Sequence, residues 1–212
     1  LEQAGAAAIE LNIFRIPADL SEDGGEVDRE CVDALRAVKG AVRIPVSVKL
    51  SPYHSSTGHF ALQLTRAGAD GLALFNRFYE PGIDLATLEP KLDFDLSTPA
   101  DTRLGLAWIS LLRGQVGGAS LAATSGVWDG EDVVRYLLAG ADVVMSASAL
   151  LRHGPAHVGT LVRGLRAWIE RHGDDGVSAL RGRLSASRRG GDPGAFLRAH
   201  YRDILTSGRT YR

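Results

Sequence analysis

An Ala-Gly-Ala segment followed by an apolar run occurs three times and constrains the fold of this chain more than any other feature. The copies are AGAAAIELNIF (4–14), AGADGLALFNR (67–77) and AGADVVMSASA (139–149). Each is typical of a helix end, a glycine turn and a strand, because glycine adopts the left-handed conformation that commonly ends a helix. Two further runs, PVSVKL (45–50) and ASLAATSG (119–126), have the same strand character. Near-continuous apolar strands are typical of parallel sheets covered by helices.

Amphipathic or well-capped segments separate these runs and predict helices. The predicted helices span 26–39, 58–66, 97–114, 128–140 and 154–173. Five alternating strands and helices favour parallel pairing through right-handed crossovers. Two architectures have this order, an open doubly wound sheet and a (β/α)8 TIM barrel. Because no G-x-G-x-x-G follows the first strand, the dinucleotide-binding form of the open sheet is disfavoured.

The number of strands and the first residue bear on the choice between these two architectures. A (β/α)8 barrel needs eight strands, whereas the sequence indicates five. The chain also begins at Leu1 and not at a Met. Either the sheet is open, or about three βα units belong before Leu1.

The C-terminal region differs in composition from the repeated βα units. We predict a barrel domain over 1–173 and an Arg-rich extension over 174–212. Segment 182–194 is rich in Gly, Ser and Arg and is expected to be irregular, and a last helix is expected around 194–205. The residues expected to face inward from that helix are Phe196, Leu197, Tyr201 and Leu205.

The composition is that of an ordinary folded chain. The 212 residues are 45% hydrophobic and 23% charged, with a formal net charge of −1. This excludes a disordered tail, a collagen-like repeat and a disulfide scaffold. No run approaches 18 apolar residues, so no membrane span is expected. The single Cys31 fits a reducing cytoplasm, and the six histidines form no metal-binding pattern.

Charge is distributed unevenly along the chain. Residues 1–151 carry 12 basic and 20 acidic side chains, whereas residues 152–212 carry 12 and 5. The simpler interpretation is a solvated basic face that balances the acidic body. The alternative is a contact with phosphate or an acidic partner. Because few aromatic residues interleave the arginines, nucleic-acid binding is not expected.

The last two predicted strands end in small residues that lead directly into helices. These segments are AATSG (122–126) and MSAS (145–148). Small side chains let backbone N–H groups approach an anion, and the dipole of the following helix favours it. In barrels a phosphate often binds between the loops after strands 7 and 8. The alternative is that small residues only permit tight packing of strand and helix. The residues of the predicted phosphate cradle are Ser125, Gly126, Ala147 and Ser148.

Lys49 ends an otherwise apolar strand and is one of only three lysines. Strand alternation places it on the same side as Ser47. Burying an ammonium is costly unless an anion or a carbonyl receives it. Lys49 is therefore predicted to stabilise charge on a bound cofactor or to form a Schiff base. The alternative is a lysine that reaches solvent at the rim of the barrel.

Asn12 and Asn76 also stand at strand ends, and an amide can both donate to and accept from a planar ring. A turn-forming role is the other interpretation. Arg15 and Arg77 follow closely. They either bind an acidic substrate or pair with acidic side chains. The acidic partners proposed for them are Asp19 and Glu80.

These segments, in this order, resemble the C-terminal two-thirds of class 1 dihydroorotate dehydrogenases, and more closely the dihydroorotate dehydrogenase-like bacterial branch. The matching segments are AIELNI (8–13), PVSVKLSP (45–52), GADGLALFNRF (68–78), LSTPADTRL (96–104), ATSGVWDGEDVVRYLLAGADVV (123–144) and SALLRHGP (148–155). The resemblance implies an FMN-containing TIM barrel that oxidises dihydroorotate to orotate in pyrimidine synthesis, an oxidation of a CH–CH bond. It implies a small-molecule substrate and a cytoplasmic protein, and leaves a homodimer open. On this resemblance we expect the five strands to be strands four to eight of the α/β barrel, with Leu1 just before strand four.

The resemblance also implies roles for particular residues. Asn12 would lie at the edge between flavin and substrate, Lys49 would contact the polar edge of the isoalloxazine ring, and Asn76 would bind substrate. Ser97 and Thr98 would lie beside the ribityl chain. The predicted cradle would bind the FMN phosphate.

The loop after Asn12 departs from the family pattern. The family has N-x-S-C-P-N or N-x-S-S-P-N, whose Cys or Ser is the catalytic base, whereas this chain has Arg15 at that position. A guanidinium does not release its proton in a protein and cannot act as a base. In addition, Arg77 stands where a small hydroxyl residue is expected, and the Gly-rich anion loops become Ser125-Gly126 and Ser146-Ala147.

We therefore expect the flavin-binding residues of the family to be largely retained, whereas the loop that carries the catalytic base is altered. The substrate is then dihydroorotate or another small acid, which Arg15 and Arg77 would accommodate. Two alternatives remain at this point. One is a flavin-free phosphate-binding or Schiff-base barrel enzyme that uses Lys49, and the other is a non-catalytic flavin-binding descendant.

Overall fold

The computed structural model describes residues 1–78, 81–91, 95–189, 202 and 205–206, and its centre is a parallel sheet. The five strands of this sheet lie side by side in the order in which they occur along the chain, β1-β2-β3-β6-β7, and β4 and β5 form a separate two-stranded sheet. In a doubly wound sheet the strand order reverses at a switch point, whereas consecutive strands of a barrel follow one another. The order therefore confirms the predicted α/β class and is that of consecutive barrel strands. The strands are β1 (Ile9–Asn12), β2 (Val46–Leu50), β3 (Gly71–Leu74), β6 (Ser120–Ala123) and β7 (Val143–Val144).

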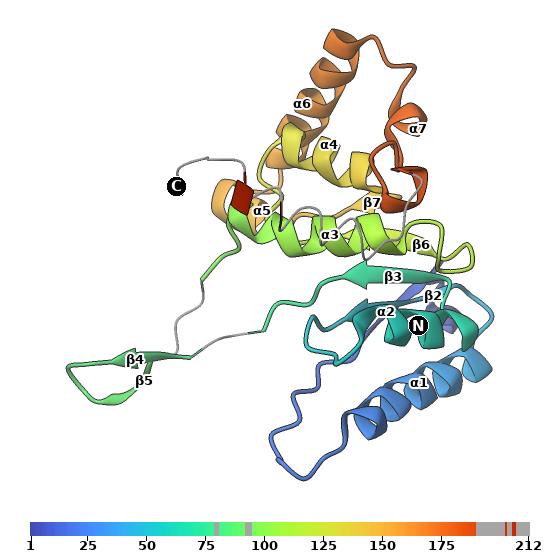
Figure 1. The fold of residues 1–212 in the computed structure, drawn as a ribbon, viewed down its shortest axis with the longest axis vertical. Helices are drawn as coiled ribbons and strands as arrows, with labels where there is room; N and C mark the ends of the chain where they lie inside the picture. The colour runs from blue at the N-terminus through green and yellow to red at the C-terminus, as the bar shows by residue number, and fades with distance from the viewer. Residues whose placement is uncertain (79–80, 92–94, 190–201, 203–204, 207–212) are drawn as a thin grey trace.

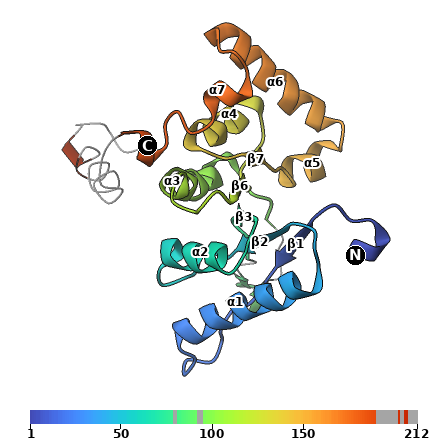
Figure 2. The ribbon, with the colours of Figure 1, turned by 90° about the vertical axis from the view of Figure 1, so that its right-hand side faces the viewer.

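The helices that link these strands lie on one face of the sheet, as Figures 1 and 2 show for α1 to α4. The burial pattern of β2 reflects this one-sided cover. Val46, Val48 and Leu50 are almost completely buried under the helices, whereas the residues between them are only partly buried. Apolar burial on this face is the main force that holds the layers together. The helices that follow the five strands are α1 (Gly24–Ala41), α2 (Thr57–Arg66), α3 (Thr102–Leu112), α4 (Gly130–Ala139), and the pair α5 (Ser148–His153) and α6 (His157–His172).

The helix predicted over 154–173 is confirmed as α6, whereas the short α5 before it was not predicted. Gly154 has a φ of +81°, which ends α5, and Pro155 has no N–H group to continue it. The helix predicted over 97–114 begins with a short 3-10 helix, η2 (Pro99–Asp101). Thr98 and Asp101 form the capping box of this helix.

Three further short elements and one hairpin were not predicted. The hairpin of β4 (Gly82–Asp84) and β5 (Glu89–Lys91) projects away from the sheet (Figure 1). The short elements are η1 (Glu2–Ala4), α7 (Val177–Leu180) and η3 (Ala186–Arg189). No helix in the described ranges is long and apolar enough to cross a membrane.

Part of the predicted C-terminal extension packs against the helical layer. The backbone N–H groups of Gly182 and Leu184 donate to the carbonyls of Leu137 and Leu138 at 2.9 Å each, and Leu180 is fully buried. Residues 182–185 are turns without regular secondary structure, as expected, and they bond to α4. The expectation of an irregular segment is wrong for residues 186–189, which form η3. The domain boundary at 173 stays a prediction.

The predicted terminal helix lies largely outside the described residues. Of its four residues expected to face inward, the structure describes Leu205, which is 55% exposed. The inward orientation is therefore wrong for Leu205.

Helices α4 and α6 cross at two glycines, and this contact leads to a test of the fold. A Cβ at Gly164 would lie 2.9 Å from the Cα of Gly130. We expect Gly164→Ala to lower the free energy of unfolding by about 2 kcal/mol, because overpacking forces the helices apart. Urea unfolding followed by circular dichroism measures it. The control is Gly159→Ala on the same helix, where a Cβ would meet only the end of the Arg163 side chain. Equal stability of the two variants would contradict the prediction.

Candidate functional site

The strand register places two rows of side chains on the sheet face opposite α1 to α4. The row nearer the carboxyl ends is Asn12, Lys49, Ala73 and Ala122, and the row below is Glu10, Ser47, Gly71 and Ser120. Residues paired across parallel strands face the same side, and alternate residues along each strand share it. Because β3 and β6 contribute only small residues to this face, space is left beside the longer side chains of β1 and β2.

A groove of about 660 Å³ opens at the carboxyl ends of the strands. This volume lies within the usual range of small-molecule sites, and this end of the strands is where barrel proteins bind ligands. Most of the predicted site residues line it together. They are Lys49, Asn76, Arg77, Ser97, Ser125, Gly126, Ala147 and Ser148.

Two predicted site residues, Asn12 and Thr98, stand outside the described lining of the groove. Asn12 is still connected to it, because its Oδ1 accepts a hydrogen bond from Nδ2 of Asn76. Neighbouring strands lie about 4.8 Å apart, so side chains from β1 and from the end of β3 meet only if they converge over β2. Thr98 instead serves as the N-cap of η2.

Lys49 lies at one end of the groove and points along the inner face of the sheet. Its Nζ is 3.8 Å from Oε1 of Glu10, and the two side chains are 22% and 33% exposed. Sequence reasoning did not single out Glu10. The signal was present, since Glu10 is two residues before Asn12 and therefore shares its face of β1.

Three loops meet at the other end of the groove, and Ser97 connects them. The Ser97 hydroxyl donates to Oγ of Ser148 at 2.7 Å and accepts from the backbone N–H of Gly126 at 3.2 Å. The backbone N–H of Ser97 also donates to Oγ of Ser148 at 3.0 Å. Two hydroxyls and the backbone N–H of Gly126 thus converge, and the hydroxyls can rotate to donate to an anion.

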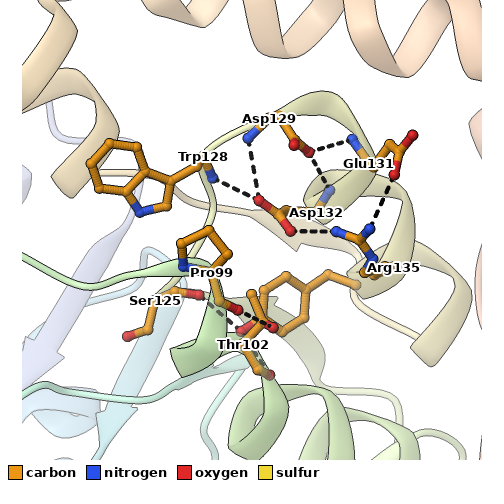
Figure 3. Close-up of polar contacts among 9 residues, drawn as sticks. Pro99, Thr102, Ser125, Trp128, Asp129, Glu131, Asp132 and Arg135 are labelled. Atoms are coloured by element: carbon orange, nitrogen blue, oxygen red, sulfur yellow. Dashed lines mark hydrogen bonds and ion pairs between the residues drawn. The ribbon is translucent and has the colours of Figure 1, made fainter. Parts of the chain in front are cut away.

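The first turn of α4 does not contribute to this cradle as the sequence suggested. The carboxylate of Asp129 accepts from the N–H groups of Glu131 and Asp132 at 2.8 and 2.9 Å. Figure 3 shows both N–H groups turned to Asp129. The positive end of the helix dipole is therefore already neutralised by the protein's own carboxylates. The expectation that the α4 dipole favours an anion is wrong for this reason.

Asp132 and Tyr136 on α4 hydrogen-bond to the loop after β6 that carries Ser125 and Gly126, which we call the cradle loop. Asp132 is 2% exposed, accepts from the N–H groups of Trp128 and Asp129, and pairs with Arg135 at 2.6 Å (Figure 3). The hydroxyl of Tyr136 lies within 3.0 to 3.3 Å of three carbonyl oxygens, of which it can donate to one at a time. Burial, with nearby Asp132, raises the pKa of Tyr136 well above its usual range, so it remains a neutral donor. The three carbonyls belong to Thr102, Thr124 and Ser125.

Consecutive left-handed residues shape the cradle loop, since Ser125 has a φ of +78° and Gly126 of +72°. Gly126 needs its lack of a side chain, because a Cβ there would lie 2.7 Å from the carbonyl oxygen of Thr98. At Ser125 the same conformation costs a residue with a Cβ about 1 kcal/mol. The loop therefore keeps a glycine-like backbone at a position that no longer has glycine.

We expect Ser125→Gly to raise the free energy of unfolding by about 0.5 to 1 kcal/mol, because it removes this conformational cost. Ser125→Ala keeps the Cβ and is the matched control, for which no gain is expected. Thermal and urea unfolding of the three proteins measure the difference. A glycine variant that is no more stable than the alanine variant would contradict the assignment of strain to Ser125.

Arg15 is held away from the groove by two acidic side chains. Its guanidinium pairs with Glu22 at 2.9 Å and with Glu30 at 3.0 Å. Asp19, proposed from the sequence as its partner, instead accepts hydrogen bonds from Ser21. Arg77 does line the groove and lies 4.0 Å from Asp101. Glu80, the other proposed partner, lies outside the described residues.

Arg15 lines a second cavity of about 340 Å³ between the loops that follow β1 and β2. Lys49 borders both spaces. This cavity is also lined by a partly buried pair that the sequence did not reveal, His54 Nδ1 and Asp28 Oδ1 at 2.8 Å. Burial, with nearby Asp28, raises the pKa of the Cys31 thiol, which agrees with its expected role as a small core residue.

The consecutive parallel strands and the groove at their carboxyl ends are those of a protein of the (β/α)-barrel class, in which ligand sites lie at this end of the strands. Comparison with known proteins gives the family. The model of the dihydroorotate dehydrogenase family matches residues 6–169, and the chain belongs to this family.

Curated relatives agree with this assignment. Dihydroorotate dehydrogenase A (fumarate) of Limosilactobacillus reuteri is 31% identical over 175 residues, which cover 80% of this chain and 56% of that protein. The catalytic subunit of dihydroorotate dehydrogenase B (NAD(+)) of Shouchella clausii is 31% identical over 80% of this chain and 57% of its own length. The chloroplastic dihydropyrimidine dehydrogenase (NADP(+)) of Arabidopsis thaliana is 26% identical over 86% of the chain and 47% of its length. The chain thus spans about half the length of these relatives.

Proposed function

We propose that this chain forms the cofactor groove of an FMN-dependent oxidoreductase that oxidises a CH–CH bond in a small cyclic acid, with dihydroorotate as the first substrate to test. One observation carries the proposal. A cation at the sheet, Lys49, and a cradle of hydroxyl and N–H donors at Ser97, Gly126 and Ser148 line one continuous groove. A flavin mononucleotide needs both kinds of group, because its ring accumulates negative charge on reduction and its phosphate is anionic throughout.

The residues of the groove fit FMN in chemical character. Ser97, Gly126 and Ser148 would hold the phosphate, and Lys49 would face the polar edge of the ring. FMN would supply the hydride acceptor. Asn76, oriented by its bond to Asn12, would present an amide to the substrate, and Arg77 would add positive charge for an acid.

The catalytic base is the part of the site that differs from the family pattern. Arg15, at the usual position of the base, is an ion-paired guanidinium that faces the second cavity. It can neither reach the groove nor accept a proton. We therefore propose that the substrate, the base or both differ from those of the relatives, and leave the base unassigned.

The decisive experiment is anaerobic addition of dihydroorotate to the purified protein carrying FMN. Loss of the flavin absorbance near 450 nm is the expected result. Failure to bind FMN would overturn the proposal. Bound flavin that no dihydropyrimidine and no nicotinamide donor reduces would instead indicate a non-catalytic flavin-binding protein. Borohydride trapping of a substrate on Lys49 without flavin would indicate a Schiff-base enzyme. Sedimentation of the same sample tests for a homodimer.

A further inference from the structure

Two residues on the inner face of the sheet are charged, among the strand residues that the structure describes. They are Glu10 on β1 and Lys49 on β2, and the paired positions of β3 and β6 on this face are Gly, Ala or Ser. A carboxylate and an ammonium in such surroundings interact more strongly with each other than with the small neutral residues beside them. The pair therefore dominates the electrostatic field on the inner face of the sheet, where Lys49 lines the groove.

The geometry of this pair is unlike that of a structural ion pair. Glu10 is opposite Ser47 in the register, so Lys49 is its diagonal neighbour, two residues nearer the groove. Nζ and Oε1 are 3.8 Å apart, and neither side chain is fully buried. Partly exposed pairs at such distances contribute little to stability.

The ion pair of Lys39 and Asp70 differs from that of Lys49 and Glu10 and has a structural role. Lys39 contacts Asp70 at 2.7 Å, and the same carboxylate accepts from the N–H of Val46, which fixes the amino end of β2. Glu10 has no such second bond to the backbone in the described contacts. The consequence of Glu10 is therefore to be found in the field that it creates at Lys49 and not in the stability of the sheet.

We propose that Glu10 is the counter-ion of Lys49, a positioning residue that sets how much positive charge the groove presents to an anionic ring edge. This inference rests on the proposed function. The carboxylate attracts the ammonium toward the lower row and cancels part of its field at the upper row. An anionic group that enters above Lys49 competes with Glu10 for the same ammonium. Glu10 thus raises the free energy of negative charge in the groove.

Other charged groups line the groove, but they lie on other segments than Glu10 and Lys49 and include residues of both signs. Arg77 lies 4.0 Å from Asp101, Asp95 lies between β5 and η2, and Arg103 is in α3. None of them is on β1 or β2. A change at Glu10 is therefore expected to act first on Lys49.

The test is Glu10→Gln in the FMN-loaded protein, because glutamine keeps the shape and removes the charge. Sulfite adds reversibly to flavins, bleaches their absorbance and binds more tightly where positive charge lies near the ring. We expect Glu10→Gln to tighten sulfite binding about fivefold, as estimated for a unit charge several ångströms from the ring at intermediate dielectric. For a two-electron couple the same factor raises the midpoint potential by about 20 mV.

Two controls separate this effect from alternatives. Asp33→Asn removes a carboxylate of the exposed Asp33–Arg36 pair on α1 and should leave sulfite binding unchanged. In the Lys49→Met background, Glu10→Gln should change sulfite binding less than it does in the wild type, because a positioning residue acts partly through its partner. The affinity for FMN itself reports any loss of structure.

The outcomes distinguish the inference from the proposed function. Unchanged sulfite affinity and potential in a Glu10→Gln protein that binds FMN normally would overturn the role of Glu10 and leave the proposed function intact. An equal shift in Asp33→Asn would also overturn it. A wild-type protein that binds no FMN would overturn the proposed function, and the inference with it.

Discussion

Replacing Lys49 with methionine is expected to slow flavin reduction by dihydroorotate at least about a hundredfold, the usual cost of losing one preorganised group that stabilises developing charge. Lys49 is the cation that β2 contributes to the lining of the groove, beside the bonded side chains of Asn12 and Asn76. Methionine preserves the length and the apolar stem of the side chain. The reduced ring would then carry its negative charge without an ammonium beside it. Anaerobic stopped-flow absorbance measures the rate.

A second lysine supplies the control for this experiment. Lys39→Met makes the same change in net charge but acts on an ion pair at the amino end of β2. The hydrogen bond from Lys39 lowers the pKa of Asp70, so this variant should lose stability and keep its rate of flavin reduction. A Lys49→Met protein that reduces its flavin within threefold of the wild-type rate would contradict the role assigned to Lys49.

The strands of the sheet could be predicted because their burial leaves a direct mark on the sequence. Residues 45–50 form an apolar run that the structure shows as β2 (Val46–Leu50). Within 139–149 the helix end and the glycine turn were predicted correctly, but the strand itself is short, since β7 pairs only at Val143–Val144. The small residues after Val144 belong to the loop that leads into α5. Small residues fit both a buried strand and a tight loop, so composition alone could not place the boundary.

The hairpin of β4 and β5 could not be predicted, because its sequence has no comparable burial pattern. Each strand has three residues, and those of β5 are all exposed, so no burial pattern repeats. Helix α5 was also missed, because its six residues are too few to show a helical period. Gly154-Pro155 marks its end, and the predicted helix began at that point, close to the start of α6.

Within the site, single residues were easier to predict than their partners. Lys49 stood out as a charge in an apolar strand, whereas its partner Glu10 looked like an ordinary polar residue of a half-buried strand. Arg15 was recognised as unable to act as a base, but its partners Glu22 and Glu30 depend on how the loop after β1 returns to α1. Side-chain partners distant in sequence are set by tertiary packing, which one sequence does not encode locally.

The loop after β6 depends on Asp132, and this dependence predicts the largest loss of stability in the site. We expect Asp132→Ala to lower the free energy of unfolding by about 3 kcal/mol. The change would leave the N–H groups of Trp128 and Asp129 without their acceptor and Arg135 without its close partner. Each unsatisfied buried group costs about 1 to 3 kcal/mol. Because Trp128 donates from its ring to the carbonyl of Ser97, the loss should extend to the cradle and weaken FMN binding as well.

The matched control is the other carboxylate of the same capping box. Asp129→Ala removes an exposed helix cap and should cost only about 1 kcal/mol, with FMN affinity almost unchanged. Urea unfolding and fluorescence titration with FMN measure both quantities on both variants. Equal losses in the two proteins would mean that Asp132 acts only as a helix cap. A larger loss at Asp132, with weaker FMN binding, would show that the buried carboxylate of α4 supports the cradle through Trp128 and Ser97.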